Sequence, residues 1–119
     1  MTLLTREAIL GASDIKTQTV DVPEWGGTVL VGAMNGQARD EWEQSLITRA
    51  GGKSEPNLAN VRARLVAATV VDESGQRIFS AADVQALGNK SSAALERVCK
   101  VAQRLNGLGD ADLEELKGN

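Results

Sequence analysis

Histidine is absent from this chain of 119 residues, and cysteine occurs once, as Cys99. Without histidine the chain lacks the commonest general base at neutral pH and cannot form a serine triad or most catalytic zinc sites. One cysteine excludes an intrachain disulfide, and a reducing cytoplasm is the simplest compartment for it. Because Cys99 lies on the apolar stripe of a predicted helix, we expect a buried, inert thiol. We therefore expect a non-enzymatic protein with no metal and no cofactor.

Aromatic residues are also scarce: Trp25, Trp42 and Phe79 make up 3% of the chain, and tyrosine is absent. The core must consequently be built from leucine, valine, isoleucine and alanine. Hydrophobic residues total 42% and charged residues 24%, as in folded globular proteins. The first ten residues include Arg6 and Glu7 and contain no long apolar run, so we expect neither a signal peptide nor a membrane anchor.

Charges of the two signs balance over most of the chain. Residues 1–109 carry 12 basic and 12 acidic side chains. Residues 110–119 carry four acidic side chains and one lysine, which accounts for the net charge of −3. A neutral body lacks the basic footprint of a nucleic-acid-binding protein, so we expect no nucleic acid partner.

This change in charge divides the expected organisation into an α+β domain over residues 1–109 and a short acidic C-terminal segment over residues 110–119. Leu113 and Leu116 lie in that segment, on a predicted turn that is too short to be stable alone. We expect these leucines to dock on a neighbouring subunit or on a partner. The alternative is that the segment is disordered in the free monomer.

Strand periodicity is clearest between Val20 and Val31, where two alternating apolar runs flank the turn-rich stretch from Pro23 to Gly27. This pattern predicts a β-hairpin over about residues 16–33. Trp25 lies in the connection, and two interpretations of it stay open. Its ring can fold back onto the sheet as part of the core, or it can be an exposed anchor for a partner, because aromatic residues are enriched at interface hot spots.

Helical patterns account for most of the remaining chain. Expected helices lie at residues 6–10 behind a Thr5 cap, near 36–46 with Trp42 in the core, from an Asn57 cap to about 69, at 80–87 behind a Ser-Ala-Ala-Asp capping box, and at 91–106. Residues 50–56 are interpreted as a loop, and the β-branched run at 69–71 leaves helix and strand open. The sequence thus predicts a small single α+β domain: one β-hairpin, or three short strands, packed against four to five helices.

Two short motifs are similar to ligand-binding loops but fail in register. Gly51-Gly52-Lys53-Ser54 matches the end of a P-loop, but Ile47 occupies the position that requires the first glycine. Asp72-Glu73-Ser74-Gly75 is similar to part of a calcium loop, but Val70 and Ala81 would occupy its first and last ligand positions. We expect a flexible loop at the first motif and a turn with an Asx hydrogen bond at the second.

Four segments follow one another along most of the chain: L-L-T-R-E-A-I-L, V-D-V-P-E-W-G-G-T-V, V-V-D-E-S-G-Q-R-I-F-S-A-A-D-V-Q-A-L and R-L-N-G-L. In their order and spacing they resemble the tail assembly chaperones of long-tailed, siphovirus-type bacteriophages. In the third segment we expect a tight turn followed by Ile78 and Phe79, both docked under the next helix.

The resemblance implies a non-enzymatic chaperone that coats the tape measure protein, keeps it soluble in the host cytoplasm and is absent from the mature virion. It also implies self-association and a longer form made by ribosomal frameshifting, which would recruit tail tube protein. This chain would be the shorter, upstream-frame product. Our candidate partner-binding residues are Trp25, Leu113 and Leu116.

Two other function classes compete with this interpretation. A structural virion protein of the tail or of the head–tail connector is also a small α+β domain that oligomerises. A regulatory or toxin–antitoxin binding module is disfavoured because the sequence has no basic patch. Presence in purified particles distinguishes the first alternative, since a chaperone leaves the particle and a connector stays.

Overall fold

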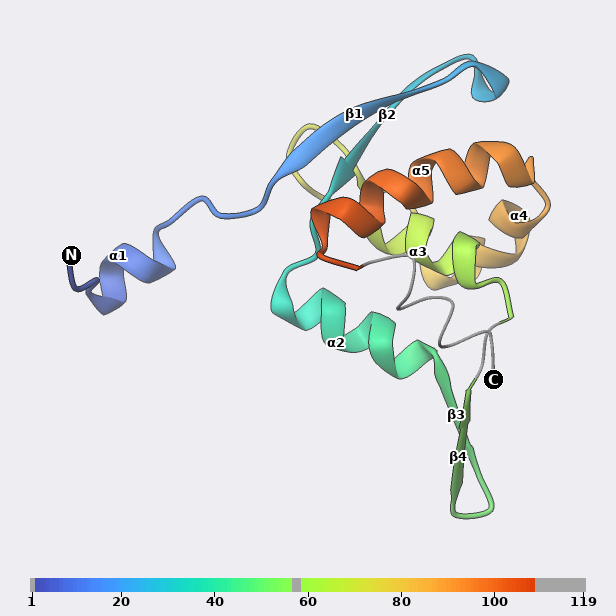
Figure 1. Cartoon of the computed structure of the whole chain (residues 1–119), viewed down its shortest axis with the longest axis horizontal. Helices are drawn as coiled ribbons and strands as arrows, with labels where there is room; N and C mark the ends of the chain where they lie inside the picture. The colour runs from blue at the N-terminus through green and yellow to red at the C-terminus, as the bar shows by residue number, and fades with distance from the viewer. Residues whose placement is uncertain (1, 57–58, 109–119) are drawn as a thin grey trace.

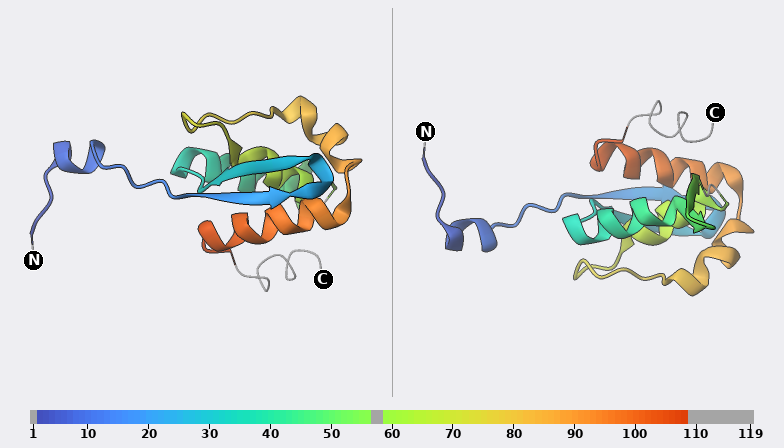
Figure 2. Two further views of the ribbon diagram at one scale, coloured as in Figure 1. Left: turned by 90° about the horizontal axis from the view of Figure 1, so that it is seen from above. Right: turned by 90° about the horizontal axis from the view of Figure 1, so that it is seen from below.

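The computed structural model describes residues 2–56 and 59–108 (Figure 1). A three-stranded antiparallel sheet has the strand order β1-β2-β5, with β1 at Thr17–Val22, β2 at Gly27–Gly32 and β5 at Val70–Val71. Helices α3 (Val61–Thr69) and α5 (Ser92–Leu105) pack together under one face of this sheet (Figures 1 and 2). The predicted α+β class, with strands packed against four to five helices, is confirmed.

The predicted hairpin is present, with β1 and β2 paired from Thr17↔Gly32 to Val22↔Gly27. A 3-10 turn, η1 (Pro23–Trp25), and Gly26 connect the two strands. Gly26 has a φ of +79°, in the left-handed region that glycine reaches without a Cβ penalty. Side chains alternate across the sheet, so those of Val20, Val22 and Val31 point inward and are buried.

The remaining helices begin close to where the capping residues predict. Helix α1 spans Arg6–Leu10 and α2 spans Gly36–Ser45, while η2 (Ala81–Asp83) leads into α4 (Val84–Gly88). The side chains of Thr5, Asn35 and Ser91 each accept a hydrogen bond from the backbone N–H three residues on, at the starts of α1, α2 and α5. The Ser80–Asp83 capping box is formed, although its first turn is 3-10 rather than α-helical.

Helix α5 ends as predicted at Asn106 and Gly107. Gly107 has a φ of +68°, and its N–H donates to the Arg104 carbonyl at 3.3 Å. The N–H of Leu108 reaches back to the Gln103 carbonyl at 2.7 Å. These two bonds form a Schellman motif, which satisfies the carbonyls that the end of a helix leaves unpaired.

The loop predicted at residues 50–56 is wrong, because β3 (Ile47–Ala50) and β4 (Lys53–Pro56) form a second antiparallel hairpin there. Gly51 and Gly52 join the strands with φ values of +60° and +78°. Two consecutive positive φ angles are what a two-residue type I′ hairpin turn requires, and glycine supplies them. The sequence pattern did not predict these strands, because they are polar and lack the apolar–polar alternation of strands in a half-buried sheet.

The expectation that Ile78 docks under the next helix is also wrong. Ile78 is 52% exposed, whereas the neighbouring Phe79 packs against the core. Consecutive residues of an extended segment point to opposite sides, so only one of the two side chains can face inward. The open choice at residues 69–71 is resolved both ways: Thr69 ends α3, and Val70–Val71 form strand β5, which pairs with β2. The Asn57 cap lies outside the described residues, and Asn60 occupies the N-cap position of α3.

The core lies between the sheet, α2, α3 and α5. Its largest aromatic member is Trp42, which is 5% exposed, as predicted. Cys99 is 1% exposed, so the buried thiol is confirmed. Outside the core, residues 2–17 are all exposed, and the N-terminal segment that contains α1 projects away from the body (Figures 1 and 2).

Candidate interaction site

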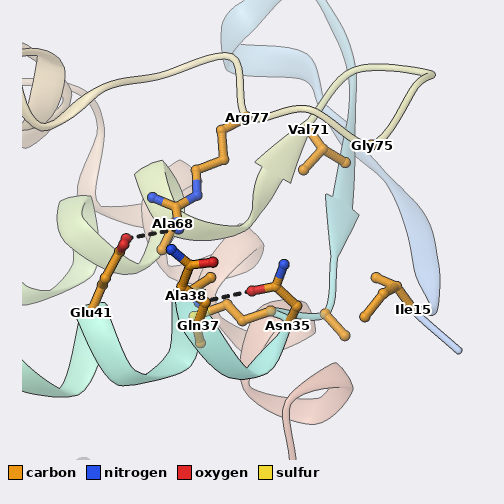
Figure 3. A pocket seen from close by; sticks show the side chains of 11 residues that line it. Ile15, Asn35, Gln37, Ala38, Glu41, Ala68, Val71, Gly75 and Arg77 are labelled. Carbon is orange, nitrogen blue, oxygen red and sulfur yellow. Dashed lines mark hydrogen bonds and ion pairs between the residues drawn. The ribbon is translucent and has the colours of Figure 1, made fainter. Parts of the chain in front are cut away.

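Two adjoining hollows run along α2 and are together called the α2 groove. The first has a volume of about 260 Å³ and lies where the end of β2, the start of α2 and the 72–77 turn meet (Figure 3). The second has a volume of about 310 Å³ and continues toward η2 and α4. Ala38, Glu41, Ala68 and Arg77 line both hollows, so the groove is continuous. The second hollow is also lined by the apolar side chains of Trp42 and Ala67, which are buried, and of Phe79 and Val84, which are partly exposed.

The start of α2, at one end of the groove, is held by Asn106 from the end of α5. The Asn106 Oδ1 accepts a hydrogen bond from the backbone N–H of Met34 at 2.7 Å. The Asn106 carbonyl accepts a second one from Arg39 Nη1 at 3.0 Å. Arg39 is in turn paired with Glu43 at 3.0 Å, as the i, i+4 spacing predicts. The position of α2 therefore depends on a residue that is distant in sequence.

An ion pair crosses the groove where the two hollows meet. Arg77 Nη2 lies 3.5 Å from Glu41 Oε2 (Figure 3). Arg77 is placed by the predicted Asx turn, in which Asp72 Oδ1 accepts hydrogen bonds from the N–H groups of Ser74 at 2.9 Å and Gln76 at 3.0 Å. Hydrogen bonds from the Ser74 side chain and from these amides hold the pKa of Asp72 below its ordinary value.

Arg64 lines the second hollow and ties α3 to the end of α2. Its guanidinium donates to the Ser45 carbonyl and to the Ala59 carbonyl. Burial lowers the pKa of Arg64, but an arginine guanidinium is not deprotonated in proteins. This wall of the groove is therefore cationic and hydrogen-bonded to backbone.

The second apolar surface is the N-terminal arm, defined as residues 2–16. It carries five large exposed hydrophobic side chains, with exposed fractions from 50% to 92%: Leu3, Leu4, Ile9, Leu10 and Ile15. Figures 1 and 2 show the arm extending away from the sheet in all three views. Only its last part approaches the body, where Ile15 lines the mouth of the first hollow (Figure 3).

Trp25, the aromatic candidate for partner binding, lies at the end of η1 and is partly buried against the core. Its indole Nε1 is buried without a hydrogen-bond partner in the described part of the chain. The structure thus places the ring on the core and leaves part of it exposed. Trp25 lies far along the chain from Leu113 and Leu116, which fall outside the described residues.

Sequence reasoning missed both the groove and the arm as candidate surfaces. The groove joins Glu41 to Arg77 across 36 positions, and no local pattern indicates that contact. The arm did carry a signal: a predicted helix of five residues, flanked by Leu3 and Leu4, is too short to bury its own apolar side chains. Exposure of large apolar side chains in such a segment indicates a surface that is covered by something else.

Within residues 2–56 and 59–108, no group of three or more cysteine, aspartate or glutamate side chains is arranged to hold a metal ion. In the same residues, no helix is long and apolar enough to cross a membrane. The surfaces that the described residues leave open are a shallow groove, which is mainly apolar in its second hollow, and an apolar arm.

Such a fold, with surfaces suited to docking, is that of an interaction protein. The sequence matches the family model described as phage tail assembly chaperone over residues 5–119. The chain therefore belongs to the phage tail assembly chaperone family, which is non-enzymatic.

A solved structure supports the fold independently. The chain is similar to the structure described as that of the bacteriophage HK97 tail assembly chaperone, with a TM-score of 0.57 and 21% sequence identity. The similarity covers 86% of this chain and 93% of the HK97 chain. None of the curated proteins compared with the chain matches it significantly.

Proposed function

We propose that this chain coats the tape measure protein of its phage and keeps it soluble while the tail is assembled. The observation that carries the proposal is the family match over residues 5–119. Large hydrophobic side chains that the described residues leave exposed support it, because a protein that shields another chain needs uncovered apolar surface. The proposed site of action is the host cytoplasm, and the protein leaves before the virion is mature.

The proposed partners are tail proteins and further copies of the chain. A longer form made by ribosomal frameshifting would share this domain and recruit tail tube protein. Trp25 is proposed as one partner-binding residue, because this residue beside the hairpin turn is only partly buried. Leu113 and Leu116 of the acidic segment are proposed as two more, on the sequence argument alone.

Co-expression tests the proposal. The tape measure protein is produced alone and with this chain, and its soluble fraction is measured after centrifugation. We expect a several-fold larger soluble fraction when this chain is present. An equally insoluble tape measure protein in both samples contradicts the chaperone role. Analysis of purified particles adds a second test, because finding the chain in mature virions contradicts its proposed departure.

Salt dependence tests the chemistry of the same complex. Residues 1–109 carry no net charge, so apolar contact is expected to dominate binding. The affinity should then change by less than about threefold between 50 and 500 mM salt, whereas a protein with 6–10 phosphate contacts loses about 10³–10⁵ in affinity from 50 to 200 mM. A loss of that size contradicts the apolar mode of binding.

A further inference from the structure

The N-terminal arm contains helix α1, although none of the other described residues buries its apolar side chains. Thr5 caps α1 by accepting a hydrogen bond from the Ala8 N–H at 3.1 Å. Leu4 and Ile9 occupy the two positions, before the cap and at the fourth helical residue, that form a hydrophobic staple. A helix of five residues is unstable in water without tertiary contacts. These local signals therefore indicate that α1 is completed by packing on another surface.

We propose that the N-terminal arm of one copy docks in the α2 groove of a second copy of this chain. The second hollow of the groove is the complementary surface, since apolar side chains dominate its lining and no helix of the described residues fills it. A cavity of about 150 Å³ can hold a benzene ring, so each hollow has room for a leucine or isoleucine side chain from the arm.

The direction of the arm favours a second copy over the arm's own groove. Ile15 lies at the mouth of the first hollow of its own chain (Figure 3). From that point the chain leads outward, and α1 lies far from the body (Figures 1 and 2). To dock in the groove of its own chain, the arm would have to turn back near Ile15. A neighbouring copy receives the extended arm without that reversal.

Charge is compatible with this contact. The arm carries two basic and two acidic residues, so it has no net charge. In the groove, Glu41 and Arg77 already neutralise each other at 3.5 Å. Arg64 adds one positive charge to the second hollow, but the neutral arm brings no excess of positive charge to it, so apolar side chains determine the fit. Every copy has both an arm and a groove, so the contact can be repeated from copy to copy in a ring or an open chain. Alternatively, two copies can each place an arm in the other's groove and form a closed dimer.

Arm and groove variants test the contact separately. The arm variant combines Leu4→Gln, Ile9→Gln and Leu10→Gln, all at positions at least 56% exposed. The groove variant combines Gln37→Lys and Ala81→Lys, exposed positions that line the first and second hollows. Light scattering and sedimentation velocity should give an oligomer for the unchanged chain and the 12.6 kDa monomer for each variant. Circular dichroism and thermal melts verify that each variant is folded.

Mixing the two variants gives the decisive result. The groove variant keeps an intact arm and the arm variant keeps an intact groove, so the mixture should form a 1:1 dimer and nothing larger. Controls are Gln85→Lys with Ala93→Lys, exposed on α4 and α5 outside the groove, and Ile78→Gln, in the segment after β5 and in neither hollow. These controls should keep the mass of the unchanged chain.

A monomeric unchanged chain, a mixture that stays monomeric, or controls that also dissociate the oligomer would each overturn the proposal. This contact deepens the self-association within the proposed function and does not involve the tape measure protein. The co-expression test can therefore succeed when the mixing experiment fails, and the two failures are distinguishable.

Discussion

Arg97 of α5 binds Glu24 of η1 through two parallel hydrogen bonds, Nη1 to Oε1 at 2.7 Å and Nη2 to Oε2 at 2.9 Å. This bidentate pair joins residues 73 positions apart and fixes the hairpin turn over the end of the core. Trp25 follows Glu24 directly and packs against that core. The hydrogen bonds from Arg97 lower the pKa of Glu24 to about 2.

The Glu24–Arg97 pair predicts a specific dependence of stability on pH. The folded-state pKa of Glu24 lies below its ordinary value of 4.5, so the stabilisation is fully present above pH 4.5 and is lost as the pH falls toward 2. Glu24→Gln should lower the urea midpoint at pH 7 and have little effect near pH 2. Glu7→Gln, in the exposed arm, is the control and should change neither midpoint. An equal effect of Glu24→Gln at both pH values contradicts the role of the ionised pair.

The two glycines of the hairpin turn should respond differently to the same substitution. Gly26 has a φ of +79°, and no atom lies within 4 Å of the position that an alanine Cβ would take, so Gly26→Ala suffers only from the backbone conformation. We expect a loss of about 1–2 kcal/mol in the free energy of unfolding. Gly27→Ala also meets open space, but its φ is not in the left-handed region, so its loss should be smaller. Urea titration of both variants measures the difference, and equal losses contradict it.

The elements that the sequence predicted correctly are those with local causes. Thr5, Asn35 and Ser91 cap their helices through bonds to residues three positions away, and the hairpin follows from alternation and Gly26. Such interactions depend on neighbours in sequence, which a single chain displays.

The groove could not be predicted in the same way. It depends on Asn106 holding Met34 across 72 positions and on Arg77 reaching Glu41 across 36. Neither contact is indicated by a periodicity or a short motif in the sequence. The β3–β4 hairpin was missed for another reason: its polar strands carry no alternation, so the Gly51-Gly52 pair, itself a signal for a two-residue hairpin turn, was interpreted as part of a loop.

Asn106 should contribute more to stability than an ordinary helix C-cap. Its Oδ1 accepts the Met34 N–H and its Nδ2 donates to the Ala102 carbonyl at 2.7 Å. Asn106→Ala leaves the part-buried Met34 N–H without this acceptor, which should cost about 1–3 kcal/mol in the free energy of unfolding. Asn89→Ala, at the exposed C-cap of α4, is the matched control and should cost less. Chemical denaturation compares the two, and equal costs would show that the bond to Met34 does not contribute.

The melting temperature of the chain should not change when small ligands are added. The Gly-Gly-Lys-Ser and Asp-Glu-Ser-Gly motifs fail in register, so we expect the same melting temperature with chelator, with calcium and with nucleotide. A ligand at 100 times its dissociation constant stabilises a protein by about 2.7 kcal/mol, which shifts the melting temperature by several degrees in a domain of this size. A shift of that size with any of the three additions contradicts the ligand-free prediction.

Replacing each tryptophan by alanine separates packing from partner binding. Trp42 is 5% exposed in the core, so Trp42→Ala should cost about 3–5 kcal/mol in the free energy of unfolding. Trp25 is only partly buried, so Trp25→Ala should cost less, because less of its surface is removed from water.

If the exposed part of Trp25 binds a partner, Trp25→Ala should also weaken the complex with the tape measure protein by about 2 kcal/mol or more. Urea titration and a binding isotherm on the same variant measure the two effects. Unchanged affinity in a folded Trp25→Ala variant assigns the ring to the core alone and removes it from the proposed binding residues.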